Sequence, residues 1–252
     1  METLFVGQNL ISLSECPSVN THANMLLKQQ KVPEGTVIFT PNQTSGRGQR
    51  GTNWYSEPGK NITMSAVLYP VFLNTDEAFL LSMTASMAVY DLLSCFLPLQ
   101  TDIRIKWPND LLVSGRKICG ILIENVLREG KIVSSVLGVG INVNQTEFSV
   151  HHGNATSIKK ETDMDLDVMG LMNRFCGFLE SRYLALRRGD KVKMIQDYND
   201  ALYLRGQNHS FKTGEGEEIK AIIQRVGTDG KLVLKDVVSG QCLQFGFKEL
   251  IF

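Results

Sequence analysis

The sequence lacks the cysteine pattern of a disulfide-stapled or zinc-binding protein. Its 252 residues include five cysteines, an odd number, and none of them belongs to a Cys-x-x-Cys pair. They are scattered as Cys16, Cys95, Cys119, Cys176 and Cys242. This spacing predicts reduced, mostly buried thiols. Cys119 lies within an apolar run and is expected to be a small core residue.

Membrane and export signals are also missing. No apolar stretch is long enough to cross a bilayer, and no basic segment followed by an apolar run opens the sequence. The 26 Lys and Arg residues balance 26 Asp and Glu residues, which argues against capture of nucleic acid or an anionic membrane by charge alone. We expect a soluble, cytoplasmic globular protein of one or two domains, with no DNA and no membrane partner.

The order of the predicted elements indicates an α+β protein. Strands are expected at residues 9–13, 37–40, 61–69 and 131–140, a capped helix from Ser18 or Asn20, a buried helix over 78–95, and helices over 165–200. From about residue 203 the pattern changes to short strands with tight turns, of which Asp229-Gly230 is a strong hairpin signal. This pattern predicts a small all-β module, a barrel of about 50 residues, that docks on the larger domain.

Residues 104–124 are the stretch around which the chain is organised. Two short strands, residues 111–113 and 118–123, are predicted on either side of a tight turn. Pro108 excludes a central strand or a mid-helix position at that point. The polar side chains expected on or beside this hairpin are those of Lys106, Asp110 and Lys117. Two lysines and a carboxylate suit a site for anionic groups. The alternative is a surface loop with a solvated hairpin tip.

A glycine- and arginine-rich segment, residues 43–51, follows the second predicted strand. Three glycines alternate there with Arg47, Gln49 and Arg50. Glycine lets backbone N–H groups approach an anion, and arginine adds forked donors for phosphate or carboxylate. The segment matches neither a Walker loop nor a dinucleotide fingerprint. It is either a loop that becomes ordered on a ligand or a flexible basic loop, and Trp54 after it either stacks on a flat ring or anchors the loop.

Gly138 and Gly140 interrupt the apolar strand predicted at residues 131–140. A glycine inside a strand indicates either the close approach of another group to the backbone or a β-bulge, and both interpretations stay open. His151 and His152 lie in a polar loop without a partner at ligand spacing, so we expect them at the surface.

Four segments carry a recognisable pattern. They are Gly-Arg-Gly-Gln-Arg-Gly at 46–51, Lys-Trp-Pro-Asn-Asp at 106–110, Arg-Lys-Ile-Cys-Gly-Ile-Leu-Ile-Glu at 116–124 and Gly-Val-Gly-Ile-Asn at 138–142. In this order they resemble biotin protein ligases, also called biotin–[acetyl-CoA-carboxylase] ligases. The resemblance implies a class II synthetase-like catalytic domain with a mixed or antiparallel sheet over residues 1–200 and an SH3-like barrel over 203–252. It implies a monofunctional enzyme without the DNA-binding domain of bifunctional relatives.

The resemblance also implies the chemistry. Biotin and ATP, with Mg²⁺, form biotinyl-5′-AMP and pyrophosphate, and biotin then passes to one lysine of a biotin carboxyl carrier protein. Arg47 and Lys117 would contact the activated carboxyl and phosphate, and Asp110 would orient or help to deprotonate the incoming amine. Gly46 and Gly48 would form the loop that closes over the adenylate.

Further site residues follow from the same resemblance. Positions around the ureido ring of biotin are matched by Ser18, Asn20, Thr21 and Gln43. Backbone walls beside the apolar chain of biotin are matched by Gly120, Gly138 and Ile141. Positions for ATP or the adenylate are matched by Gln49, Arg50, Trp54, Asn61, Lys106, Asn109 and Asn142. Gln49 replaces a residue that is basic in many members, so less positive charge is expected on the adenylate loop. Val19 replaces a common threonine.

Two other functions remain compatible with the sequence. A lipoate-type ligase or transferase shares the catalytic fold and also acylates a carrier lysine. A biotin sensor without catalysis would need a DNA-binding element, for which the sequence offers no segment before residue 9. The edge strands of the fold are compatible with a monomer or a weak homodimer.

Overall fold

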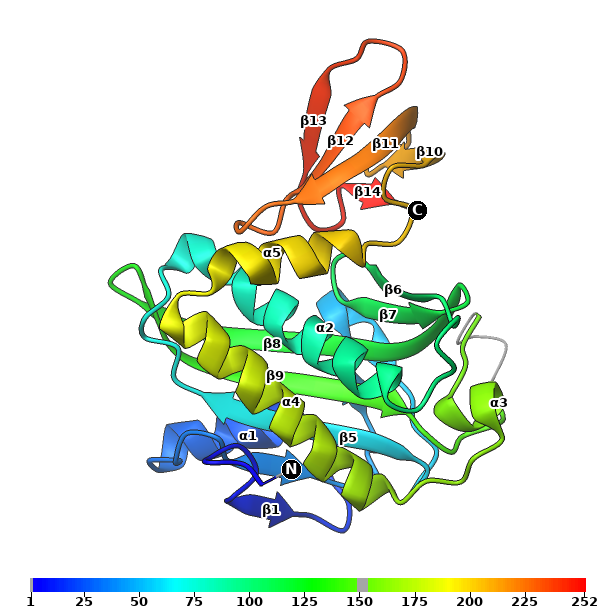
Figure 1. Ribbon diagram of the computed structural model, residues 1–252. Coiled ribbons are helices and arrows are strands. Elements are labelled where there is room, and N and C mark those ends of the chain that lie inside the picture. The colour runs from blue at the N-terminus through cyan, green and yellow to red at the C-terminus, as the bar shows by residue number, and fades with distance from the viewer. Residues whose placement is uncertain (1, 149–153) are drawn as a thin grey trace.

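The computed structural model describes residues 2–148 and 154–252, and within these ranges all side chains except that of Arg50. His151 and His152 lie outside the described residues. Figure 1 shows one large sheet with helices against it and a separate small sheet at the C-terminal end. Across the described ranges, no helix combines the length and the apolar character needed to cross a membrane.

A mixed seven-stranded sheet forms the centre of the larger part. Its order is β1 (Leu10–Ser12), β2 (Val37–Phe39), β5 (Asn61–Leu68), β9 (Lys131–Asn142), β8 (Arg116–Arg128), β7 (Asp110–Val113) and β6 (Ile103–Lys106). β1 and β2 run parallel, and every other neighbouring pair is antiparallel. The predicted strands are confirmed, β8 and β9 pair antiparallel over most of their length, and the fold class is α+β.

Helices cover both faces of this sheet. α2 (Phe79–Ser94), α4 (Val168–Arg188) and α5 (Lys191–Asp200) pack together on the near face in Figure 1, and α2 is buried over most of its length, as expected. α1 (Val19–Gln29) packs against β2, β5 and β9, where its Val19 and Ala23 join a second apolar cluster with Val67 and Val136. Side chains alternate between the two faces of a strand. β5 and β9 therefore contribute apolar residues both to the main core and to the second cluster under α1.

The helix ends follow their local chemistry. Ser18 caps α1, as predicted, by accepting from the backbone N–H of Thr21. Asp167 caps α4, and Gly189, with a φ of 100°, ends it in the left-handed region that favours glycine. The short helices α3 (Ile158–Thr162) and η2 (Thr75–Glu77) complete this part of the chain. α3 was not predicted, because five residues give no helical periodicity to detect.

The C-terminal residues form one five-stranded antiparallel sheet. Its order is β13 (Cys242–Phe245), β12 (Leu232–Asp236), β11 (Glu218–Val226), β10 (Asn208–Thr213) and β14 (Leu250–Ile251). The predicted Asp229-Gly230 turn joins β11 to β12. A closed barrel was expected and is not found, because β14 has only two residues, pairs with β10, and leaves the edge of β13 without a partner strand in the described chain.

Trp107 holds the C-terminal sheet against the larger part. Its indole N–H donates to the carbonyl of Gly230 at 2.9 Å, and its ring lies 5.6 Å from that of Phe247. Phe79 of α2 meets the same Phe247 ring at 5.9 Å. The segment of Lys106 to Asp110, which was predicted to be functional, thus also contacts the C-terminal sheet and holds it against the larger part.

Candidate functional site

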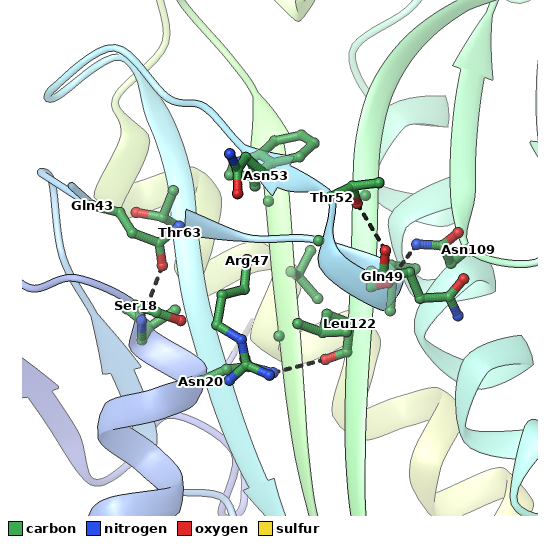
Figure 2. Close-up of a pocket in the computed structure, with 18 of the residues that line it drawn as sticks. Ser18, Asn20, Gln43, Arg47, Gln49, Thr52, Asn53, Thr63, Asn109 and Leu122 are labelled. Carbon is green, nitrogen blue, oxygen red and sulfur yellow. Dashed lines mark hydrogen bonds between the residues drawn. The ribbon is translucent and has the colours of Figure 1, made fainter. Parts of the chain in front are cut away.

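One cavity of about 350 Å³ lies on the α1 side of the central sheet, where β8 and β9 form its floor. Figure 2 shows Ser18, Asn20 and Gln43 on one side of it, Asn109 and Gln49 on the other, and Arg47 between them. The predicted site residues that line the cavity are Ser18, Asn20, Gln43, Arg47, Gly48, Gln49, Trp54, Asn109, Asp110, Lys117, Gly120 and Gly138. The structure therefore brings together residues from four separate motifs.

Glycines in the floor let two side chains lie directly on the sheet. A Cβ at Gly138 would stand 2.1 Å from Oδ1 of Asn20, and one at Gly140 would stand 2.3 Å from the indole of Trp54. Gly120 in β8 faces the same indole. The strand register is regular at these positions. Close approach of another group, and not a bulge, is therefore the reason for glycine at 138 and 140.

The glycine- and arginine-rich segment is a small hairpin and not an irregular loop. β3 (Gly46–Arg47) pairs with β4 (Asn53–Trp54), and η1 (Gln49–Gly51) forms the tip. Gly46 is required because a Cβ there would meet the carbonyl oxygen of Trp54 at 2.1 Å. The backbone N–H of Gly48 donates to the carbonyl of Thr52 at 2.7 Å, which closes the tip. The hairpin thus holds Trp54 over the floor.

Lys117 and Asp110 define one end of the cavity. Lys117 Nζ lies 2.8 Å from Oδ1 of Asp110 and 5.7 Å from the centre of the Trp54 ring. Nδ2 of Asn109 donates to the carbonyl of Ile121 at 2.9 Å, which fixes the turn that presents Asp110. The buried indole N–H of Trp54 has no hydrogen-bond partner in the described part of the chain. This end combines a cation, a carboxylate and a donor that a ligand oxygen could accept from.

Asn20 and Arg47 define the other end. Asn20 Nδ2 donates to the carbonyl of Leu122 at 3.1 Å, and Ser65 Oγ donates to Asn20 Oδ1 at 2.6 Å. Gln43 Oε1 accepts from the backbone N–H of Val19 at 3.0 Å. This end is polar but lacks an uncompensated charge, since Arg47 is paired with Glu124 at 2.7 Å.

Arg47 and Lys117 do not meet in this structure. The guanidinium of Arg47 lies on Glu124 and Thr21, while the amine of Lys117 lies on Asp110. Glu124 and Lys117 are seven residues apart on β8, which corresponds to roughly 23 Å along a strand. The shared contact with one activated carboxyl that the resemblance implies for Arg47 and Lys117 therefore stays a prediction.

Several expected site residues lie behind the cavity wall. Asn61 is buried and bonded to Gln145 and to the backbone N–H of Val143, and Asn142 donates to the carbonyl of Thr156. Ile141 is fully buried in the core, and Lys106 lies 5.1 Å from the centre of the Phe252 ring. Thr21 and Gly46 adjoin the cavity through Arg47 and Trp54. The side chain of Arg50 lies outside the described parts.

Sequence reasoning missed other residues of the wall. They include Thr52, Asn53, Thr63, Met64, Leu122, Gly140 and Lys248. Gly140 had a signal, since glycine interrupts an apolar strand. Lys248 had none, because only the docking of the C-terminal sheet brings it to the cavity.

Cys119 is fully buried in β8 beside the end of the cavity that Lys117 and Asp110 define. Burial raises the pKa of its thiol far above the ordinary range, and the Asp110 carboxylate adds to this effect. All five cysteines are free thiols, and Cys16, Cys119 and Cys176 are buried, in line with the sequence prediction.

Comparison with known proteins places this site in a family context. The sequence profile of the Biotin/lipoate A/B protein ligase family matches residues 14–142. The bifunctional ligase/repressor BirA of Bacillus spizizenii is 34% identical over 186 residues, which are 73% of this chain and 56% of that protein. The chain thus spans little more than half the length of that relative.

Two further proteins match over more of their length. The biotin–[acetyl-CoA-carboxylase] ligase of Mycobacterium tuberculosis is 28% identical over 225 residues, 85% of this chain and 79% of that protein. The solved structure of biotin protein ligase from Aquifex aeolicus with biotin and ATP superposes with a TM-score of 0.78 at 23% identity, over 97% of this chain and 98% of that one. At that identity the superposition shows a common fold.

Proposed function

The chain belongs to the Biotin/lipoate A/B protein ligase family, and we propose on that basis that it is an ATP-dependent biotin protein ligase. It activates biotin to biotinyl-5′-AMP and transfers the biotinyl group to a specific lysine of a biotin carrier domain. The names of relatives from two bacteria, biotin–[acetyl-CoA-carboxylase] ligase, support this substrate pair.

The observation that supports the proposal most is that the lining of the cavity changes from neutral polar side chains at one end to a positive charge at the other. Ser18, Asn20 and Gln43 offer directional donors and acceptors at one end, and Lys117 offers a positive charge near the other. Glycine backbone lies between the two ends. Biotin has the same sequence of parts: a neutral ureido ring, an aliphatic chain and a carboxylate. Its ring would lie near Asn20 and its carboxylate near Lys117.

The first step joins two anions, which is the difficulty that the reactive end must solve. A carboxylate oxygen of biotin attacks the α-phosphorus of ATP, the bond from phosphorus to the bridging oxygen breaks, and pyrophosphate leaves. Lys117 offsets the repulsion between the anions and the charge that develops on phosphorus. Arg47, with Gly46, Gly48, Gln49 and Arg50 of the hairpin, is proposed to close over the adenylate.

Mg²⁺ would enter with the phosphates of ATP. The carboxylates of Asp110 and Glu124 each already contact a cation, Lys117 and Arg47 respectively. Magnesium in nucleotide sites is held largely by phosphate oxygens and water. Its chemistry when bound would be to neutralise the departing pyrophosphate.

The second step is acyl transfer. The acceptor lysine attacks the activated carbonyl carbon, the bond to the phosphate oxygen breaks, and AMP leaves. Asp110, which lines the cavity beside Lys117, is proposed to orient the amine and accept its hydrogen bond. Trp54, Asn109 and Lys106 would contact the nucleotide, while Asn61 and Asn142 would hold the surrounding backbone in place.

The remaining parts of the proposal concern the whole molecule. We assign residues 1–200 to a catalytic domain and residues 203–252 to an SH3-like domain, supported by the separate five-stranded sheet of the latter. The protein is proposed to act in the cytoplasm as a monomer or weak homodimer, with a carrier domain as its partner and without DNA or a membrane. The free state of all five cysteines supports a reducing compartment.

A lipoate-type ligase is the second candidate, since the matched family includes lipoate ligases. The polar end of the cavity favours biotin, because a dithiolane ring offers no amide to pair with Asn20 and Gln43. Biotin-dependent exchange of labelled pyrophosphate into ATP, with lipoate and octanoate in parallel, separates the two. We expect exchange with biotin; exchange with lipoate alone would overturn the proposal.

A further inference from the structure

Glu124 of β8 collects hydrogen bonds from three side chains around the polar end of the cavity. Arg47 Nη2 donates to Oε1 at 2.7 Å, and Asn20 Nδ2 and Asn24 Nδ2 donate to Oε2 at 3.1 Å and 2.9 Å. The Arg47 side chain is 48% exposed, so this ion pair contributes little to the free energy of unfolding. The importance of Glu124 therefore lies in the side chains that it holds in place.

The first side chain it holds is that of Asn20. The two N–H groups of the Asn20 amide face Leu122 O and Glu124 Oε2, so the amide cannot turn over without losing both bonds. Oδ1 accepts from Ser65 Oγ and lies over Gly138, in the floor of the cavity. An oxygen with a remaining lone pair is thus presented to the cavity, and it suits a ligand that donates an N–H.

The second side chain is that of Arg47. Its Nη1 donates to Thr21 Oγ1 at 3.2 Å while Nη2 donates to Glu124. A guanidinium has five N–H donors in a rigid plane, so a group anchored by two of them keeps others for a ligand. Arg47 belongs to the hairpin, whereas Thr21 belongs to α1 and Glu124 to β8. The contact therefore ties the hairpin to both elements.

We infer that Glu124 is a positioning residue for the substrate: it orients the Asn20 amide and fixes Arg47 at the polar end of the cavity. The inference rests on the proposed function, in which this end takes the ureido ring of biotin. Glu124 touches no reacting atom, and without it the β3–β4 pairing and the contact with Thr21 still hold Arg47 on the hairpin, so loss of Glu124 raises the KM for biotin and leaves kcat nearly unchanged. A ground-state interaction that is also kept in the transition state behaves in this way.

Glu124→Gln separates the orientation of the Asn20 amide from the fixing of Arg47. The single oxygen of glutamine can still accept from Asn20 and Asn24, but its amide N–H groups cannot accept from Arg47. We expect the KM for biotin in pyrophosphate exchange to rise roughly tenfold, as for the loss of one charge-assisted hydrogen bond, while kcat stays within about threefold of wild type. Glu124→Asp, which keeps the charge on a shorter arm, should recover part of the affinity.

Two more variants complete the design. Asp102→Asn removes an ion pair of the same length, 2.7 Å to Arg104, between exposed side chains away from the cavity, and should change neither constant. Asn24→Ala weakens the support of Glu124 without altering a cavity-lining residue, and should raise the KM for biotin by a smaller factor.

The outcomes are distinct. An unchanged KM in Glu124→Gln, or a lower kcat at unchanged KM, overturns the inference. If Glu124→Gln lowers the melting temperature below the assay temperature, Asn24→Ala decides: a raised KM at wild-type melting temperature supports the inference, and an unchanged KM overturns it. Wild-type protein that exchanges no pyrophosphate with biotin contradicts the proposed function instead.

Discussion

The indole of Trp54 occupies the space in which a side chain at position 140 would stand. A Cβ built on Gly140 lies 2.3 Å from the ring, closer than non-bonded carbon atoms approach. Because Trp54 belongs to the hairpin and Gly140 to the floor, this contact sets the height of the hairpin above the sheet.

Gly140→Ala should therefore displace Trp54 and with it the hairpin. We expect adenylation to fall by about two orders of magnitude, as for misplaced substrate-positioning groups, with a smaller loss of stability from the strained contact. Pyrophosphate exchange and thermal unfolding would measure both effects. Combining Gly140→Ala with Trp54→Ala removes the clash, so the double variant should unfold at the temperature of Trp54→Ala alone. An unfolding temperature of the double variant below that of Trp54→Ala would show that the added methyl group clashes with another residue.

Lys117→Ala should abolish most of the adenylation. Loss of one group that stabilises developing charge typically costs a factor of about 10²–10³ in kcat. Pyrophosphate exchange at saturating biotin and ATP would measure it. Lys131→Ala is a matched control, because Lys131 lies at the far end of β9 and its amine donates to Asn74, away from the cavity. A kcat within threefold of wild type for Lys117→Ala would contradict the role assigned to Lys117.

Asp110→Asn should separate the two steps. Asparagine keeps the shape of the side chain but cannot act as a base, so transfer from preformed biotinyl-5′-AMP to a carrier lysine should slow by about 10² or more, whereas pyrophosphate exchange should fall less. Single-turnover transfer followed by quenching would measure the first rate. Equal losses in both steps would indicate that Asp110 acts only through its ion pair with Lys117.

Arg182 should be important for stability and not for activity. It donates to both oxygens of Asp91 at 2.7 Å and 2.8 Å and to Asp197 at 3.0 Å, and so joins α4 to α2 and α5. Arg182→Leu leaves the partly buried carboxylate of Asp91 without a cation and leaves Asp197 with only the exposed Lys193, and we expect a loss of about 3 kcal/mol in the free energy of unfolding. Arg188→Leu, which breaks an exposed pair with Asp190, should change it by less than about 1 kcal/mol. Similar losses in urea unfolding of both variants would contradict this ranking.

Features that depend on residues close together in the sequence could be predicted from it. The strands, the cap of α1 by Ser18 and the turn at Asp229-Gly230 follow from periodicity and residue chemistry, and the structure confirms them. Glycine at 138 and 140 indicated either a close approach or a bulge, and the structure shows the close approach. The sequence could not indicate that Asn20 and Trp54 approach there, because both come from distant segments.

Features that depend on packing were not predictable. Lys248 reaches the cavity only because the contact of Trp107 with Phe247 docks the C-terminal sheet on the larger part. Glu124 meets Arg47 only because the hairpin of β3 and β4 lies against the cavity. The C-terminal sheet stays open because its last strand is two residues long, a boundary that periodicity does not resolve. The resemblance assigns Asn61 and Asn142 to nucleotide positions, yet their side-chain amides bond to backbone groups of Val143 and Thr156.

The most direct test of the central claim is to incubate the protein with biotin, ATP, Mg²⁺ and an apo biotin carrier domain and to locate the product by mass spectrometry. We expect one biotinyl group on one lysine of the carrier, with AMP and pyrophosphate formed in equal amounts, and no product when ATP is left out. Binding of biotin without AMP formation, or acylation by lipoate in place of biotin, would contradict it.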